Sequence, residues 1–236
     1  MPEAGKGAIT SMVSMVSTTI TAGTPLLVAE QLAGVRGERK LFQKLDLSLR
    51  AGEIRWLRGR NGRGKTTLLR MLAGSSSPEQ GEIRVLGQAL RSMPAVSRVH
   101  VGYIAHANAL KDDLTAAEAL TFLGALSGRT PAPFEVVEAL KRLGIASRAS
   151  AAVRTLSQGQ RRRVALARLA LPGGPRVWLL DEPFDALDDR GIEVLNGLLA
   201  EHAAAGGAVL LTSHQMLTLR DPEPSMLNLD DYSVLA

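Results

Sequence analysis

Residues 59–66 of this chain read GRNGRGKT. The stretch fits the pattern G-x-x-x-x-G-K-[ST], in which glycines let backbone N–H groups wrap the phosphates of a nucleotide. The apolar run 54–57 before it predicts a strand, and the sequence TLLRML within 65–72 predicts a helix. A phosphate bound between them would lie at a helix N-terminus, where the helix dipole favours an anion. This stretch therefore predicts a nucleotide-binding α/β fold.

Each part of this loop has an expected role. Lys65 should reach the β- and γ-phosphates, and the Thr66 hydroxyl should ligate Mg²⁺. The expected nucleotide contacts are Gly59, Arg60, Asn61, Gly62, Arg63, Gly64, Lys65, Thr66 and Thr67. Arg60 and Arg63 add charge where small or neutral residues are commoner, and they could either tighten nucleotide binding or contact a partner.

A second acidic element follows the apolar run VWLL at 177–180. Carboxylates at such a strand end lie at the open edge of a parallel sheet, where ligands of this fold class bind. Asp181 is the expected partner of Mg²⁺. Glu182 is then placed to polarise an attacking water as a general base.

The composition narrows the possible functions. The chain has 236 residues, a formal net charge of +5 and no cysteine, which excludes disulfides, thiolate catalysis and cysteine-ligated metals. Its positive charge and the run LSQGQRRRVALAR at 156–168 would suggest a nucleic-acid patch. Aromatic residues are only 3% of the chain, which argues against nucleic-acid binding by stacking.

Short apolar runs alternate with longer helix-like segments along the chain. We expect strands at 26–29, 54–57, 83–86, 99–105, 177–180 and 208–212, and helices at 65–72, 116–126, 134–143, 160–171 and 192–205. Alternation of this kind predicts parallel strands and an α/β core.

The N-terminal stretch 7–29 carries no charge and is long enough to cross a bilayer. Its Ser and Thr content and Pro25 make it a poor membrane helix. A secretory signal is the rival interpretation, but the stretch lacks a Leu-rich core. We expect residues 1–25 to be a disordered extension, residues 26–220 to form the folded domain, and residues 221–236 to be a short tail.

The motifs GRNGRGKTT, LSQGQ, LLDEP, ALD at 186–188 and a lone His214 occur in this order. The order resembles the ATPase domain of ABC transporters over residues 26–218. The resemblance implies a P-loop ATPase with a mostly parallel core sheet, a small antiparallel β-subdomain and an inserted helical subdomain at about 107–165. It also implies ATP and Mg²⁺ as ligands and a homodimer bound to an integral-membrane transporter subunit. Lys65, Glu182 and His214 would be the catalytic residues.

In that family the LSGGQ-like segment contacts the γ-phosphate of ATP held by the partner subunit. Ser157 and Gly159 would therefore contact the nucleotide of the partner subunit. His214 would contact the nucleotide bound at Lys65. The segment around Asp188 would communicate across the dimer. Independently, Ser157 and Gly159 precede a helix, whose N–H groups form a second anion site. The arginines at 161–163 are expected on its first turn, where the partner's ATP would offset an unfavourable dipole interaction, or at least one faces solvent or acidic residues.

Two positions depart from the family pattern. His106 stands where many members have a glutamine that binds water or metal, and its charge would change near neutral pH. We therefore expect His106 to be a candidate metal contact that makes ATPase coupling more sensitive to pH. Arg36 stands where an aromatic ring usually stacks on adenine, and a guanidinium stacks with less shape constraint, which predicts weak discrimination between ATP and GTP.

The segments HANALKDDLTAAEAL and LLDEPFDALD and the short chain resemble one branch of the family, the ATPases of cytochrome c biogenesis. This resemblance implies a peripheral subunit on the cytoplasmic face of the bacterial inner membrane, with no role for nucleic acid. ATP hydrolysis would support haem delivery, by export or by release from a haem chaperone. The alternatives are an ABC exporter of another substrate, a soluble ABC ATPase without a transport role, and a small-molecule kinase.

Overall fold

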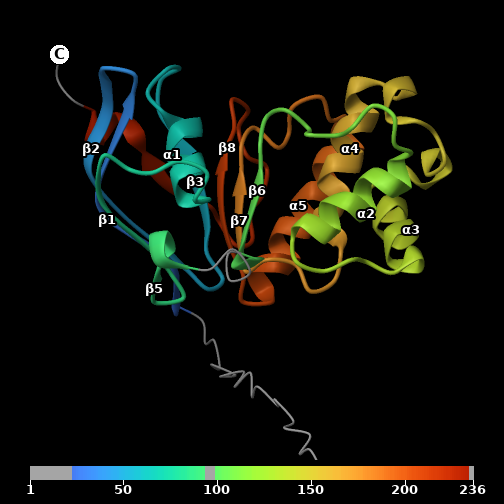
Figure 1. The fold of residues 1–236 in the computed structure, drawn as a ribbon, viewed down its shortest axis with the longest axis horizontal. Helices are drawn as coiled ribbons and strands as arrows, with labels where there is room; N and C mark the ends of the chain where they lie inside the picture. The colour runs from blue at the N-terminus through green and yellow to red at the C-terminus, as the bar shows by residue number, and fades with distance from the viewer. Residues whose placement is uncertain (1–22, 94–98, 234–236) are drawn as a thin grey trace, which may run out of the picture.

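A computed structural model describes residues 23–93 and 99–233 of the chain. Most of the expected N-terminal extension and its possible signal lie outside the described residues. A parallel sheet occupies the middle of the molecule, with an antiparallel sheet and one helix on one side and the remaining labelled helices on the other (Figure 1). The expected α/β fold with a mostly parallel core sheet and a small antiparallel sheet is confirmed.

The antiparallel sheet has the strand order β2-β1-β4-β5. Its strands are β1 (Pro25–Arg36), β2 (Arg39–Arg50), β4 (Gln80–Val85) and β5 (Gln88–Ala89). The sequence analysis found parts of β1 and β4 and missed β2. In the sequence, leucine stands at every second position, at Leu45, Leu47 and Leu49. This alternation is typical of a strand with one face in the core, and all three leucines are buried.

The core sheet has the strand order β6-β7-β8-β3-β9, and all its neighbouring strands run parallel. Its strands are β3 (Ile54–Arg58), β6 (Val101–Ile104), β7 (Val177–Leu180), β8 (Ala208–Thr212) and β9 (Ser225–Asn228). Strands β7 and β8 have the expected bounds. Both are buried on both faces, and such a strand appears in the sequence as a continuous apolar run, which marks its two ends.

Strand β9 corrects the expectation of a C-terminal tail. Residues 221–236 were expected to be a short tail after the folded domain, but Ser225–Asn228 pairs with β3, and the 3-10 helix η6 (Leu229–Tyr232) follows it. The segment SMLN is only four residues long and follows two prolines, so it carries little strand signal of its own. Its pairing with β3 depends on the tertiary fold.

The helices are α1 (Lys65–Leu72), α2 (Ala116–Leu126), α3 (Pro133–Arg142), α4 (Gln158–Ala167) and α5 (Asp189–Ala204). Helices α1 and α2 have the expected bounds. Helices α4 and α5 begin earlier than expected, because Ser157 and Asp188 cap their N-termini with side-chain hydrogen bonds.

The two faces of the core sheet enter two different apolar clusters. Leu179 and Leu210 pack with the antiparallel sheet and α1, whereas Trp178 and Leu211 pack with helices α2 to α5. Alternate residues of a strand point to opposite faces. The apolar strands therefore hold both layers together, and the ends of these strands carry the site.

Candidate nucleotide site

The phosphate loop joins β3 to α1. Gly64 precedes the helix with φ of 105°, and no side chain caps this N-terminus. A Cβ added to Gly64 would lie 3.0 Å from Leu41 Cδ1, so packing as well as φ requires glycine there. Gly59 and Gly62 also have positive φ angles, of 143° and 77°. The loop therefore presents backbone N–H groups of an uncapped helix, the arrangement that binds phosphate.

The expected metal contacts of the loop and of β7 are adjacent. Thr66 Oγ1 donates a hydrogen bond of 2.8 Å to Asp181 Oδ2, and Asp181 is 3% exposed. A hydroxyl and a carboxylate oxygen are donors that Mg²⁺ accepts, and Mg²⁺ commonly takes its other ligands from phosphates and water. Within 23–93 and 99–233, no group of three or more His, Cys, Asp and Glu could hold a metal by itself. The donor set therefore fits Mg²⁺ bound together with a nucleotide.

The side chain of Lys65, at the end of the loop, reaches back to the first residue of the loop. Its Nζ donates a hydrogen bond of 2.7 Å to the carbonyl oxygen of Gly59. This contact folds the ammonium group back over the loop, where a phosphate would displace the carbonyl as its partner.

Glu182 occupies a strained position next to Asp181. Its φ is 48°, in the left-handed region that non-glycine residues rarely adopt. Its Oε2 accepts a hydrogen bond of 2.9 Å from the backbone N–H of His214, and its Oε1 lies 3.5 Å from His214 Nε2. The geometry brings the expected general base and the expected γ-phosphate histidine together.

Thr212 is a site residue that the sequence analysis missed. The fully buried hydroxyl donates to Asp181 Oδ1 at 3.0 Å and accepts from the Glu182 N–H at 2.8 Å. It thus fixes the expected metal ligand and the backbone of the expected base at once. The feature of the sequence that could have indicated this role is a threonine at the end of the apolar run AVLLT, because a hydroxyl buried there needs hydrogen-bond partners.

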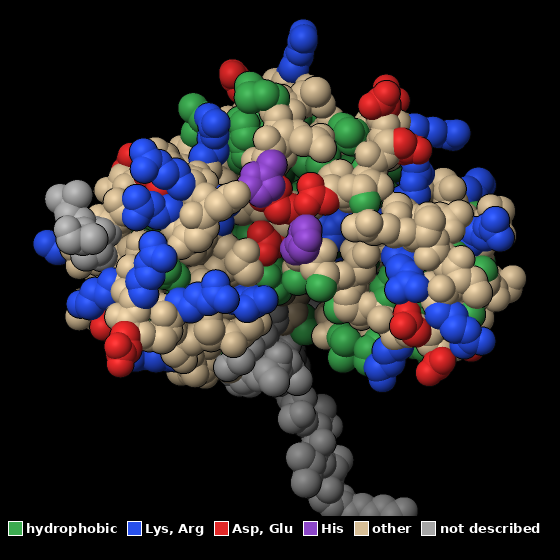
Figure 2. Space-filling view, turned by 90° about the horizontal axis from the view of Figure 1, so that it is seen from above, with side chains coloured by type: hydrophobic (Ala, Val, Ile, Leu, Met, Phe, Trp, Pro, Cys, Tyr) green, Lys and Arg blue, Asp and Glu red, His purple; other side chains and the backbone are tan. Residues whose placement is uncertain are grey.

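These residues surround a cavity of about 270 Å³ at the carboxyl ends of the core strands. The residues that line it are Arg36, Leu41, Asn61, Gly62, Gly64, Lys65, Thr66, Thr67, His106, Asp181, Glu182 and His214. A neighbouring cavity of about 550 Å³ shares Lys65 and His214 with it. Figure 2 shows histidine and acidic side chains gathered near the middle of one face, with Lys and Arg on both sides.

The two positions that depart from the family pattern both lie at this cavity. Arg36 lines it from the end of β1, and its stacking on adenine stays a prediction. His106 follows β6, and its Nδ1 lies 3.4 Å from Asp185 Oδ2. The role of His106 as a metal contact also stays a prediction.

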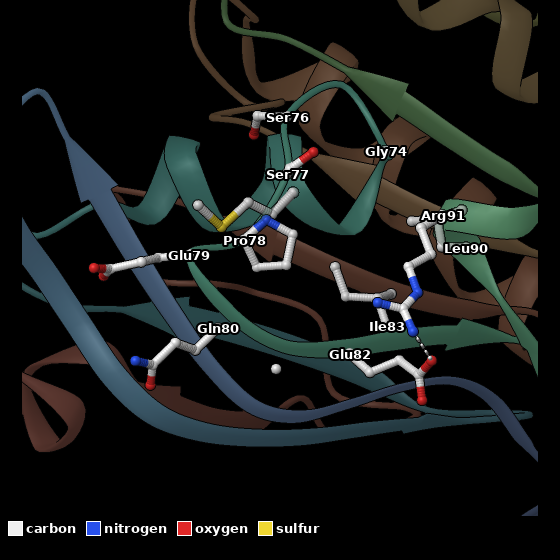
Figure 3. Close-up of a pocket in the computed structure, with 12 residues that line it drawn as sticks. Gly74, Ser76, Ser77, Pro78, Glu79, Gln80, Glu82, Ile83, Leu90 and Arg91 are labelled. Atoms are coloured by element: carbon white, nitrogen blue, oxygen red, sulfur yellow. Dashed lines mark ion pairs between the residues drawn. The ribbon is translucent and has the colours of Figure 1, made fainter.

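A further cavity, of about 480 Å³, lies between the end of α1 and β4. In Figure 3 its lining includes Ser76, Ser77 and Glu79, and Arg91 points toward Glu82, with 3.7 Å between Nη2 and Oε1. None of the expected site residues lines it. It is therefore separate from the nucleotide site.

The LSQGQ segment carries a side-chain cap at the start of α4, unlike the phosphate loop before α1. Ser157 Oγ accepts a hydrogen bond of 3.3 Å from the Gln160 N–H, and Gln160 Oε1 accepts one of 3.0 Å from the Ser157 N–H. This capping box gives the Ser157 N–H, one of the groups expected to bind an anion, a partner within the chain. Gly159 must be glycine, because a Cβ there would lie 2.8 Å from the Ala186 carbonyl oxygen. Neither Ser157 nor Gly159 lines either cavity that contains Lys65.

The three arginines after this segment, Arg161 to Arg163, lie in α4. Arg161 pairs with Asp112 at 3.1 Å, and Arg163 pairs with Asp188 and donates to the Leu143 carbonyl at 2.7 Å. Arg161 and Arg163 therefore face acidic residues of the same chain, which is one of the two arrangements expected from the sequence.

Arg162 is the most deeply buried of the three, at 2% exposure. Burial lowers the pKa of Arg162 from its usual value, while Asp185, Asp181 and Glu182 raise it. Its guanidinium donates to the carbonyl oxygens of Ala105, His106, Asp181, Glu182 and Pro183 and to Asn108 Oδ1. It ties the ends of β6 and β7 to α4 and fixes the backbone on both sides of Glu182.

Comparison with known proteins agrees with this geometry. The sequence model of the ABC transporter family matches residues 42–185. This chain belongs to the ABC transporter family. It is an ATP-hydrolysing subunit of that family, as the motifs predicted.

The curated relatives extend over most of the chain. One is a cytochrome c biogenesis ATP-binding export protein CcmA of Dechloromonas aromatica, 43% identical over 82% of this chain and 95% of that protein. A relative of the same name from Pseudomonas syringae is 47% identical over 82% of this chain and 90% of its own length. The resemblance to the cytochrome c biogenesis branch is confirmed.

Solved structures share the fold. An ATP-binding subunit of an ABC transporter has a TM-score of 0.76 and 26% identity over 86% of this chain and 85% of that one. A putative ABC transporter ATP-binding protein from Pyrococcus furiosus has a TM-score of 0.75 and 24% identity over 88% of this chain and 99% of that one. Across the described ranges 23–93 and 99–233, every helix is too short or too polar to cross a bilayer.

Proposed function

We propose that this chain supplies ATP hydrolysis to an integral-membrane transporter in cytochrome c biogenesis, either for haem export or for haem release from a chaperone. The observation that carries the proposal is the 43–47% identity to relatives named for this process, over 82% of the chain. The subunit would sit on the cytoplasmic face of the bacterial inner membrane, held there by its partner.

Different residues of the site would bind the phosphates, hold Mg²⁺ and accept a proton during ATP hydrolysis. The loop 59–67 would bind the phosphates, and Thr66 and Asp181 would hold Mg²⁺, which neutralises phosphate charge when bound. Glu182 accepts the proton of the attacking water. His214 contacts the γ-phosphate, and its backbone N–H fixes the orientation of Glu182. Thr212 and Arg162 position these groups without contacting the nucleotide.

A homodimer would complete the site. Ser157 and Gly159 lie away from the cavity that contains Lys65, which supports their proposed use on the nucleotide of a second copy. Sedimentation of the Glu182→Gln variant with MgATP tests this point, because blocked hydrolysis should trap the dimer. The same variant carrying Ser157→Arg should remain monomeric with MgATP, and a dimer of unchanged stability would contradict the shared site.

The transport role is tested by replacing the chromosomal gene with variants and measuring haem attached to periplasmic c-type cytochromes. Glu182→Gln should abolish attachment, and Glu193→Gln, on the outer part of α5, is the matched control that should not. Co-purification from detergent-solubilised membranes should recover a multi-span protein and a haem chaperone. Normal cytochrome maturation with Glu182→Gln, or recovery with ribosomes or DNA, would overturn the proposal.

A further inference from the structure

The C-terminal segment 225–232 lies directly against the phosphate loop. Strand β9 pairs in parallel with β3, and the last partners in register are Arg58 and Asn228. The chain therefore leaves β9 beside the point where the phosphate loop begins. Leu229 is fully buried there, and a Cβ added to Gly59 would lie 3.3 Å from Leu229 Cβ.

The next residue, Asp230, contacts the loop twice. Asp230 Oδ2 accepts a hydrogen bond of 3.1 Å from the backbone N–H of Arg60. Asp230 Oδ1 lies 3.2 Å from Arg63 Nε in an ion pair whose side chains are 27% and 30% exposed. One carboxylate thus spans the loop from its second residue to its fifth.

Asp230 is itself held in place. Its backbone N–H donates to Asn228 Oδ1 at 3.2 Å, which caps η6 at the end of β9. Asn228 and Asp230 line the cavity of about 550 Å³ together with Gly59, Lys65 and His214. The carboxylate therefore belongs to the wall of the site and comes from a fixed strand end.

A contact of this kind would lower the free-energy cost of ordering the loop for a ligand. Its three glycines leave the backbone many conformations in the free state, and a ligand must bear the cost of ordering them. Arg60, Arg63 and Lys65 also repel one another before any phosphate binds. A carboxylate that accepts from the Arg60 backbone and pairs with Arg63 reduces both costs, which raises affinity through preorganisation.

We propose that Asp230 is a positioning residue that holds the phosphate loop in its nucleotide-binding shape through Arg60 and Arg63. This role goes beyond the proposed transport function and rests only on ATP binding by the chain. The Arg63 guanidinium, one of the two added charges of the loop, thus contacts the C-terminal segment of its own chain.

The test measures MgATP affinity by equilibrium titration in the Glu182→Gln background, where ATP is not consumed. Asp230→Ala should weaken affinity about fivefold, the size expected for a partly exposed charge-assisted contact. Asp230→Asn keeps an acceptor for the Arg60 N–H and should lose less. Asp231→Ala is the matched control, because it removes the same charge from the same segment and Asp231 contacts Asn228 Nδ2 rather than the loop.

Two further measurements separate positioning from general damage. With Glu182 intact, Asp230→Ala should raise KM for ATP and leave kcat within about twofold, since the base and its supports are untouched. Hydrogen exchange in the peptide covering 58–66 should rise in Asp230→Ala and not in Asp231→Ala. Unchanged or tighter ATP binding in Asp230→Ala, or equal loss in Asp231→Ala, would overturn the proposal.

Discussion

Helices α1 and α4 both begin at a glycine-containing motif next to arginines, and both N-termini were expected to bind an anion. Helix α1 follows Gly64, and no side chain caps it. Helix α4 follows Ser157, whose capping box gives the N–H groups of Ser157 and Gln160 partners from within the chain. The first N-terminus has no side-chain cap to compete with a phosphate, whereas the second has a cap from its own chain.

The arginines near the two helices differ in the same way. Arg60 and Arg63 precede α1 and contact Asp230 at the surface of the site. Arg161, Arg162 and Arg163 lie within α4 and are bound to carbonyl and carboxylate oxygens of the same chain. The arginines before α1 therefore contact the chain at the edge of the nucleotide cavity, whereas those in α4 hold elements of the fold together.

The largest expected effect concerns the region of α1. Glu182→Gln keeps the shape of the side chain and an acceptor for the His214 N–H, but it removes the base. Turnover should fall by at least about 100-fold, the usual contribution of general base catalysis. Steady-state ATPase assays with purified protein measure this loss. Nucleotide affinity should be retained, and near-normal hydrolysis would show that another group is the base.

The second effect tests the internal role of the α4 arginines. Arg162→Met leaves several buried carbonyl groups without a donor, so the free energy of unfolding should fall by about 3 kcal/mol. Arg161→Met removes a more exposed guanidinium and should cost about 1 kcal/mol or less. Urea denaturation of the nucleotide-free protein compares the two. If both variants cost the same, Arg162 does not tie β6, β7 and α4 together.

A smaller effect would sharpen the contrast between the two helix N-termini. Ser157→Ala removes the side-chain cap of α4 and should lower the free energy of unfolding by about 1 kcal/mol. Ser157→Asp keeps a capping acceptor, so its stability should match that of the natural chain, yet its charge would repel a phosphate of the partner. Its ATPase activity should therefore fall. Full activity in Ser157→Asp would show that this N-terminus does not meet a nucleotide.

The last prediction uses a region remote from both helix N-termini. His202 stacks on Trp178 with ring centroids 3.7 Å apart, and its Nε2 lies 3.1 Å from the Arg176 carbonyl oxygen. Burial lowers the pKa of His202 from 6.5 to about 4. The folded protein therefore favours the neutral ring, while the unfolded chain binds a proton more readily. The stability from this site is fully present above pH 6.5 and is lost progressively as the pH falls toward 4.

Urea midpoints at several pH values between 7.5 and 4.5 test this expectation. His202→Phe keeps a ring against Trp178 and should flatten the decline in stability. An equally steep decline in His202→Phe would assign the acid sensitivity to other groups.

Much of the site could be read from the sequence because its chemistry is local. Strand, loop and helix around Lys65 are contiguous, and Asp181 and Glu182 directly follow an apolar run. Thr212 was missed because a threonine at a strand end is a common residue, and only the pairing of β7 with β8 shows that it faces Asp181 and Glu182. The N-terminal extension 1–25 lies mostly outside the described residues, so its expected disorder stays a prediction.

By itself the sequence determined the phosphate loop, the carboxylates after β7 and the family, since each depends on the spacing of residues close together in the chain. Only the tertiary structure decided the partners of the arginines, the role of Thr212 and the contact of Asp230 with the loop. Asp230 is 170 residues from Arg60 in sequence. The two meet because a four-residue strand with little propensity of its own gains its stability by pairing with β3.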